Sequence, residues 1–196
     1  MTRAARVQAL ELKDIPSDLQ TPSKWFTQPK SETLKMFEES PSLANVQRVL
    51  ANNPALMKRW MGFAHYLLNE TTLGLRDREL TILRISVLGG YDYEWGQHVR
   101  IARNACDFKD ADFEKVLAGS SHDGWSDRER ALIVMVEELM TNRAVSNEAW
   151  EKGLEHYTLV QMMDVVFVVG NYNMLGMAIN SFDVELDDGL QPIPVY

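Results

Sequence analysis

The sequence predicts an all-α protein, and three observations support this prediction. Apolar residues recur at steps of three and four along most of the chain after residue 41. Helix-start and helix-stop residues divide that part into segments of ordinary helical length. No pair of alternating strands joined by a tight turn is found, so no hairpin is expected.

The expected helices follow in chain order. The first five lie at about residues 42–50, 54–67, 77–88, 92–105 and 110–118. Pro54 suits a first helical turn, and Gly89-Gly90 suits a helix end. Ser126 and Glu129 fit a capping box for a helix through Met140.

The last two helices are expected to start at the N-caps Ser146 and Thr158. The longest apolar region, residues 159–179, is interrupted by Gln161, Asp164 and two asparagines. These polar residues favour a buried helix over a membrane span.

The chain is expected to have one helical domain, residues 41–185, between an N-terminal arm and a C-terminal tail, residues 186–196. Residues 1–40 lack a sustained period and contain four prolines within or just after them: Pro16, Pro22, Pro29 and Pro41. Their apolar anchors are Trp25, Phe26, Met36 and Phe37. The arm is therefore expected to lie against the domain or a neighbouring subunit.

Composition excludes some classes of partner. The chain has 20 basic and 28 acidic residues, a formal charge of -8, which disfavours binding to nucleic acid and to anionic membranes. Cys106 is the one cysteine, so neither an intrachain disulfide nor a CxxC pair can form. The first residues lack the apolar core of a secretory signal, and we expect a cytoplasmic protein.

The candidate site centres on Glu94 and His98, which are one helical turn apart and so share a face. Glu79 lies on the inward stripe of the preceding helix, and a short Gly-Gly-Tyr link makes the two helices antiparallel neighbours. The two acids and the histidine are therefore expected to converge on a partly buried site suited to proton transfer.

Simpler interpretations remain open at this point. Glu-x-x-x-His is also a common surface pair, and a zinc site would need a further ligand that the sequence does not supply. The aromatic residues Tyr91 and Trp95 suit a pocket wall, although either could belong to the core. Arg84 could bind a substrate carboxylate or form a structural ion pair.

These residues resemble a family. Arg78-Glu79-Leu80, Leu83-Arg84 and Tyr93-Glu94-Trp95 with His98 are similar to the carboxymuconolactone decarboxylase family, which shares its fold with the alkylhydroperoxidase AhpD group. The resemblance covers about residues 42–185. It implies an AhpD-like helical bundle and a homo-oligomer, either a trimer, a dimer or a hexamer.

The peroxidase branch of this family uses a glutamate, a CxxC pair and a histidine. The glutamate matches Glu79 and the histidine matches His98, but the cysteine positions match Tyr91 and Glu94. Neither residue can attack a peroxide, so thiol peroxidase activity is not expected.

The decarboxylase branch implies a lyase or isomerase that needs no cofactor and no metal and acts on a small carboxylated or lactone substrate in aromatic compound catabolism. His98 is the expected acid/base, oriented by Glu94, with Glu79 completing the relay. Tyr91, Trp95 and Arg84 are the expected substrate-binding residues. The alternative is a non-catalytic, oligomeric small-molecule-binding or scaffold protein.

Overall fold

The structure is a computed structural model that describes residues 5–20 and 43–195. These residues form helices and no strand, so the all-α prediction is confirmed. The α-helices are α2 (Asn45–Leu50), α3 (Pro54–His65), α4 (Leu75–Gly89), α5 (Asp92–Ala105), α6 (Asp110–Ala118), α7 (Asp127–Asn142), α8 (Asn147–Leu154) and α9 (Leu159–Phe182). A π-helical turn, Tyr66–Glu70, extends α3, and three short 3-10 turns cover Leu12–Asp14, Ser17–Leu19 and Gly119–Ser121.

The helix boundaries arise from local chemistry. The side chains of Ser126, Ser146 and Thr158 each accept a hydrogen bond from the third helical residue of α7, α8 and α9. Gly90 ends α4 in the left-handed region at φ 64°, a conformation that glycine adopts without steric cost. The expected starts and ends of α4 to α7 are therefore confirmed to within two residues, and so is the expected start of α8.

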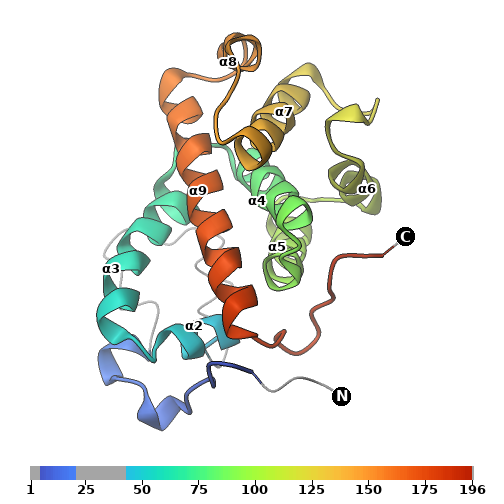
Figure 1. Cartoon of the computed structure of the whole chain (residues 1–196). Coiled ribbons are helices and arrows are strands. Elements are labelled where there is room, and N and C mark those ends of the chain that lie inside the picture. The colour runs from blue at the N-terminus through green and yellow to red at the C-terminus, as the bar shows by residue number, and fades with distance from the viewer. Residues whose placement is uncertain (1–4, 21–42, 196) are drawn as a thin grey trace.

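Helix α4 is the centre of the fold. Ten consecutive residues of it, from Asp77 to Ser86, are buried. It packs against α5, α7 and α9, while α6 and α8 cover the outer sides of this group and α3 lies on the other side of α9 (Figure 1). A helix surrounded in this way places polar residues inside the protein, where each needs a partner.

The face of α4 toward α7 meets that need with ion pairs. Arg76 bonds Glu129 at 3.1 Å, and Asp77 bonds Arg128 at 2.6 Å. Arg84 binds Glu137 at 2.7 Å and also donates to the carbonyl oxygen of Val116 at 2.9 Å. These charges join α4, α6 and α7.

The two ends of the chain pack on the helical domain where they are described. Ile15 and Leu19 of the N-terminal segment are buried in a small cluster with Leu43, Ala51 and Met57. The expected anchors Trp25, Phe26, Met36 and Phe37 lie outside the described residues. The C-terminal segment turns back under α5 (Figure 1), where Leu190 contacts Gly96.

Helix α9 is long and apolar enough to cross a membrane by length and composition, and the core helix of a water-soluble domain passes the same test. In this fold, 56% of its most apolar window is buried against the rest of the protein. Its inner side contacts α4 most extensively. The burial agrees with the expected core helix.

Candidate acid–base site

The α4–α5 hairpin brings Glu79 and His98 together. The turn at Gly90 reverses the chain, and the two helices run back along each other. His98 Nδ1 lies 2.7 Å from Glu79 Oε2, and the Glu79 side chain is completely buried. A hydrogen bond from Nδ1 to a buried carboxylate fixes the orientation of the ring and turns Nε2 toward the opposite side.

Arg78 holds the other oxygen of that carboxylate. Its Nε and Nη2 atoms donate to Glu79 Oε1 at 3.0 and 2.7 Å. The guanidinium also donates to the backbone carbonyl of Leu68, which ties the cluster to the π-helical turn after α3. Glu79 thus has charged donors on both oxygens, which is the arrangement that makes a buried carboxylate tolerable.

Glu94 lies on the free side of the imidazole. Its Oε2 is 3.6 Å from His98 Nε2, a distance too long for a strong hydrogen bond. The two groups come from successive turns of α5 and both remain buried. A substrate atom beside this gap could contact both Nε2 and the carboxylate.

The charges in the cluster shift the protonation of both central groups. Burial lowers the pKa of His98, but the charge and hydrogen bond of Glu79, together with Glu94, raise it overall to about 9. Burial raises the pKa of Glu79, but His98 and Arg78 outweigh burial and lower it below its ordinary value. At neutral pH the site therefore holds an imidazolium paired with the Glu79 carboxylate.

Tyr172 of α9 packs its ring on edge against the imidazole, with the ring centroids 5.1 Å apart. Burial raises the pKa of its hydroxyl well above 10, and the charges of Glu94 and Glu79 raise it further. Tyr172 is therefore a neutral phenol at physiological pH. It limits ring motion of His98 and can offer a hydroxyl proton as a donor.

A cavity of about 120 Å³ opens beside His98 and Glu94, between α5, α9 and the α3 side of the fold. A cavity of roughly 150 Å³ accommodates benzene, so this one suits a small molecule. Most of its lining is apolar or aromatic. The described lining residues are Ala44, Val46, Gln47, Trp60, Met61, Ala64, His65, Leu68, Asn69, Tyr93, Glu94, Gln97, His98, Ile101, Asn171, Tyr172 and Leu175.

The structure brings together the three expected catalytic residues but exchanges two of their expected roles. Glu79, fully buried behind the ring, orients His98 through Nδ1. Glu94 lines the cavity instead. The reason is geometric. The short link between α4 and α5 sets Glu79 opposite His98, whereas Glu94, one turn before His98 on α5, lies beside the cavity.

The three expected substrate-binding residues do not line the cavity. Arg84 takes the structural alternative, bound to Glu137 on the far side of α4. Trp95 packs on edge against Phe113 in the core. The Tyr91 ring packs against Gly89 and Gly176, and its hydroxyl donates to Asn173 at 2.6 Å.

Other residues form the wall instead, and sequence reasoning singled out few of them for that role. Trp60 Nε1 donates to Asn171 Oδ1 at 2.9 Å and so joins α3 to α9 across the cavity. Tyr93 and Gln97 flank Glu94 on α5. The three- and four-residue steps from Glu94 to Gln97 and His98 could have predicted that Gln97 shares their face of α5. Which neighbouring aromatics face the cavity depends on how α5 is rotated against α9.

The C-terminal tail supports this wall through Asp187. Its Oδ2 accepts a hydrogen bond from the Tyr93 hydroxyl at 2.6 Å and another from Gln97. Its Oδ1 accepts from the backbone N–H of Asn45 at 2.8 Å, at the start of α2. One carboxylate from outside the expected helical domain thus joins two elements of the cavity wall.

Two further titratable residues, His65 and Cys106, lie outside the cluster of Glu79, His98 and Glu94. His65 is buried at the cavity edge, with Asn69 at 3.0 Å and Glu70 at 3.2 Å. Burial raises the pKa of the half-buried Cys106 thiol to about 11, which makes it a poor nucleophile. Within the described ranges, no group of three or more metal-ligating side chains is close enough to hold an ion.

The class of fold is confirmed by similarity to solved structures. An uncharacterized peroxidase-related protein from Ralstonia eutropha JMP134, an alkylhydroperoxidase AhpD core structure, matches with TM-score 0.78 at 17% identity, covering 96% of this chain and 95% of that one. A peroxidase-related protein from Silicibacter sp. TM1040 matches with TM-score 0.72 at 17% identity, over 96% of each chain. The debrominase Bmp8 with bound 2,3,4-tribromopyrrole matches with TM-score 0.74 at 13% identity, covering 96% and 95%.

These similarities establish an AhpD-like fold, as the sequence predicted. Residues 54–138 match the model of the carboxymuconolactone decarboxylase family. No curated protein matches the chain. With Cys106 as the sole cysteine, the chain lacks the CxxC pair of the peroxidase branch.

Proposed function

We propose that this protein is a cofactor-independent lyase or isomerase that moves protons on a small lactone or related carbonyl compound. One observation carries the proposal: His98 is anchored through Nδ1 to a buried carboxylate and presents Nε2, next to Glu94, to a cavity. This places a proton donor and a proton acceptor side by side at a small-molecule site.

Of the two expected kinds of substrate, the lining of the cavity favours a neutral lactone over a carboxylated compound. Arg84, the residue expected to bind a substrate carboxylate, is held by Glu137 elsewhere. No lysine or arginine is found among the described residues that line the cavity, and Glu94 would repel an anion. A neutral lactone or enone of about ring size therefore fits better than a polycarboxylate.

The residues support a balanced two-step isomerisation. Glu94 accepts a proton from the carbon next to the carbonyl, and the electron pair of that C–H bond moves into the carbonyl to form an enolate. The Nε2–H of His98 stabilises the enolate oxygen by hydrogen bonding. Return of the proton to a different carbon shifts the double bond and restores Glu94.

A decarboxylation would use the same acid. The bond to the carboxylate carbon breaks, carbon dioxide leaves, and the electron pair enters the conjugated carbonyl. His98 then donates a proton to the resulting carbanion, and solvent reprotonates the imidazole. Both reactions depend on His98 being cationic at neutral pH, which its raised pKa supports.

The first experiment is a screen for ligands by shifts in melting temperature, using neutral lactones and carboxylate analogues of matched size. Neutral compounds are expected to give the larger shifts. Each binder is then incubated with protein in D2O, and incorporation of deuterium at carbon is followed by NMR. Proton transfer at carbon predicts exchange that the protein accelerates.

The matched variants separate catalysis from binding. His98→Gln and Glu94→Gln are expected to abolish exchange, whereas the peripheral substitutions His156→Gln and Glu151→Gln should leave it unchanged. Binding without exchange in the wild type would instead support the small-molecule-binding alternative. Exchange at wild-type rates in both site variants would refute the proposed chemistry.

A further inference from the structure

The side-chain amide of Asn171 forms part of the cavity wall on α9. The residue is only 4% exposed, and Trp60 Nε1 donates a hydrogen bond to its Oδ1 at 2.9 Å. An indole nitrogen can donate but cannot accept, so the atom that it meets must be the amide oxygen. The contact therefore fixes which end of the Asn171 amide faces Trp60.

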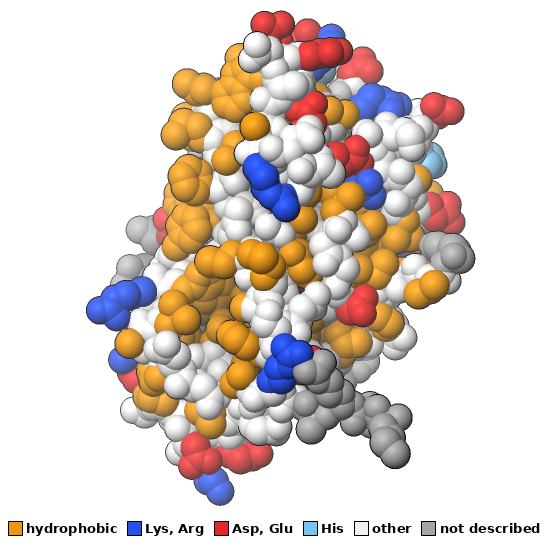
Figure 2. Space-filling view, viewed as in Figure 1, with side chains coloured by type: hydrophobic (Ala, Val, Ile, Leu, Met, Phe, Trp, Pro, Cys, Tyr) orange, Lys and Arg blue, Asp and Glu red, His pale blue; other side chains and the backbone are white. Residues whose placement is uncertain are grey.

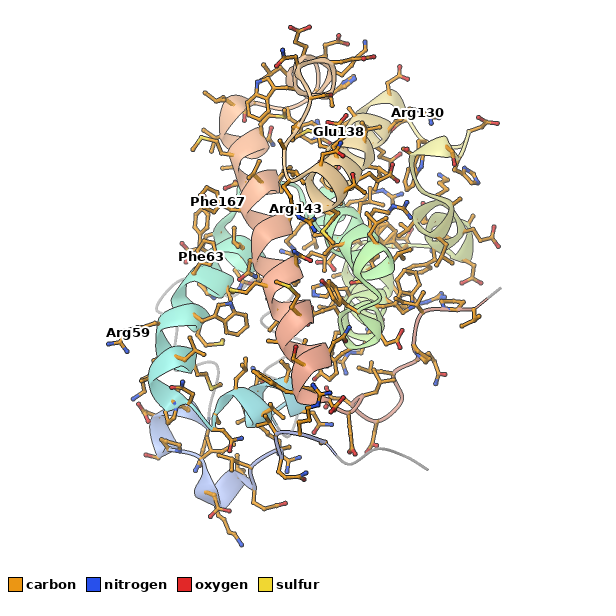
Figure 3. All side chains as sticks on the ribbon, viewed as in Figure 1. Arg59, Phe63, Arg130, Glu138, Arg143 and Phe167 are labelled. Atoms are coloured by element: carbon orange, nitrogen blue, oxygen red, sulfur yellow. The ribbon has the colours of Figure 1, made fainter. Side chains whose placement is uncertain are left out.

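A second contact between α3 and α9 keeps Trp60 in place. Phe63 and Phe167 project to the same outer side from these helices (Figure 3), and their rings meet edge to face with centroids 6.1 Å apart. Phe63 lies three residues after Trp60, and Phe167 lies four residues before Asn171, so each contact is one helical turn from the other. The two helices are thus joined by aromatic rings at the surface and by a hydrogen bond at the cavity.

The amide nitrogen of Asn171 keeps two N–H groups for a further acceptor. No described residue accepts a hydrogen bond from this Nδ2 atom. At the surface, the side chains over α9 and α3 are mostly hydrophobic (Figure 2), so they offer few acceptors. A buried donor without an acceptor destabilises a structure, and the cavity is where a ligand can supply one.

Gln97, an amide of the cavity wall on α5, shows the contrast. Its Nε2 donates to the Tyr93 hydroxyl at 3.1 Å and to Asp187, and its Oε1 accepts from Arg100 at 2.6 Å. Both ends of that amide are therefore satisfied within the chain. Gln97 supports the wall, whereas Asn171 retains donors for a ligand.

Asn171 faces a different part of the cavity from His98. Consecutive residues of a helix point about 100° apart around its axis. Tyr172, the next residue on α9, packs its ring against the His98 imidazole of α5, while Asn171 is bonded to Trp60 of α3. A ligand that fills the cavity can therefore place one oxygen at His98 and a second oxygen at Asn171.

We propose that Asn171 binds a second oxygen of the substrate, across the ring from the carbonyl group that His98 contacts. This inference rests on the proposed function and narrows its substrate to a neutral cyclic carbonyl compound with an acceptor oxygen on the far side of the ring. The amide presents only N–H groups there, so a carbonyl or ether oxygen fits, whereas a methylene group leaves the donors unpaired. Trp60 is a positioning residue, because its hydrogen bond keeps the amide from turning over.

Two ketones of the same ring size test the second oxygen. Tetrahydropyran-4-one has an ether oxygen opposite its carbonyl group, where cyclohexanone has a methylene group. In calorimetric titrations, the wild type is expected to bind tetrahydropyran-4-one about tenfold more tightly. Asn171→Leu replaces the amide by an apolar group of similar shape and should abolish this preference.

Trp60→Phe tests the positioning role. It keeps an aromatic ring but removes the indole donor, so the amide can turn its oxygen toward the ligand, and the preference should fall without disappearing. Because Asn171→Leu alone leaves the indole N–H unpaired, the double variant Trp60→Phe/Asn171→Leu removes both partners and should fold even if the single variant does not. The double variant should also lack the preference.

Matched controls make the same substitutions away from the cavity. Asn180→Leu changes an exposed asparagine of α9, and Trp150→Phe changes a tryptophan of α8, and neither residue lines the cavity. Both variants should keep the wild-type ratio of the two Kd values. Circular dichroism checks that every variant remains helical.

Deuterium exchange separates this proposal from the proposed function. His98→Gln should abolish exchange at carbon in either ketone while keeping the preference for tetrahydropyran-4-one. A preference in the wild type without any exchange would refute the proton chemistry but support Asn171 as a ligand-binding residue.

Three results would overturn the role of Asn171. The first is a wild type that binds neither ketone or binds both equally. The second is a preference that persists in both Asn171→Leu and the double variant. The third is an equal loss of affinity for both ketones in Asn171→Leu, which would place the amide at the reacting carbonyl group instead of at a second oxygen.

Discussion

Each of the two polar faces of α4 holds a glutamate paired with a basic side chain, but the two pairs lie in different surroundings. Toward α7, Arg84 and Glu137 form an ion pair enclosed by backbone carbonyls. Toward α5, Glu79 binds His98 with similar closeness, at 2.7 Å. The second pair adjoins the described cavity, and there a further carboxyl group, that of Glu94, lies 3.6 Å from the free imidazole nitrogen of His98.

Buried charge by itself therefore does not mark a candidate reactive site. Both pairs satisfy the requirement that buried ions be paired. The two pairs differ in their access to the cavity. His98 presents Nε2 to the cavity. The guanidinium of Arg84 is instead bound by the Glu137 carboxylate and by the carbonyl oxygens of residues 116 and 117.

The largest expected effect is on turnover in Glu79→Gln. A neutral amide cannot hold the imidazolium through Nδ1, so we expect a loss of about a thousandfold in kcat, in the range that general acid–base groups contribute. Because Glu79 does not touch substrate, KM should change little. The check is steady-state kinetics with a substrate from the lactone screen, together with a pH profile.

Glu79→Asp serves as the conservative control and should recover part of kcat. If Glu79→Gln kept the wild-type pH profile with a lower kcat, Glu79 would be a structural residue only.

Next in size is the loss of folding stability in Arg84→Met, on the α7 face. Removing one partner of a buried ion pair leaves Glu137 without its main charge partner, and we expect about 3 kcal/mol of destabilisation. Chemical denaturation measures this change. Turnover of the folded variant should equal that of the wild type, and a large fall in kcat would return Arg84 to the substrate-binding role.

The third effect is a pH dependence carried by His98. Because folding raises its pKa from 6.5 to about 9, its contribution to stability is complete below about pH 6.5 and is lost as the pH rises through 9. Turnover should fall over the same upper range, since the acid form is lost. Denaturation at a series of pH values measures the stability, and His98→Gln should flatten the curve between pH 6.5 and 9.

Glu79 is expected to affect the free energy of unfolding at low pH, in the opposite direction to His98. Its pKa is lowered by folding, so its contribution is present above its ordinary value of 4.5 and is lost as the pH falls through the lower folded value. A stability curve in the wild type without the decline above pH 6.5 would contradict the cationic assignment of His98.

The smallest expected effect concerns the tail. Asp187→Asn weakens the hydrogen bonds that hold Tyr93 and Gln97, so we expect a several-fold rise in KM with little change in kcat. Asp188→Asn, one residue along, is the matched control and should behave as wild type. Equal KM values for the two variants would show that Asp187 of the tail does not affect substrate binding.

Much of the fold could be predicted because its signals are local. Ser126, Ser146 and Thr158 cap the helices that follow them, and Gly90 ends α4, through bonds that span only a few residues. The pairing of Glu79 with His98 was also predictable, because a three-residue link leaves two helices few ways to pack. Whether Tyr91 or Tyr93 faces the cavity was not, since it depends on the rotation of α5 against α9.

The helical class, the lack of a CxxC redox pair and the meeting of two glutamates with a histidine could all be predicted from the sequence, because each depends on residue identity and short spacing. Tertiary structure decided which carboxylate orients His98, which aromatics form the wall, that Arg84 pairs with Glu137, and that Asp187 of the tail supports the wall. Those outcomes depend on contacts between segments far apart in the chain, where small rotations of whole helices decide which side chains point inward.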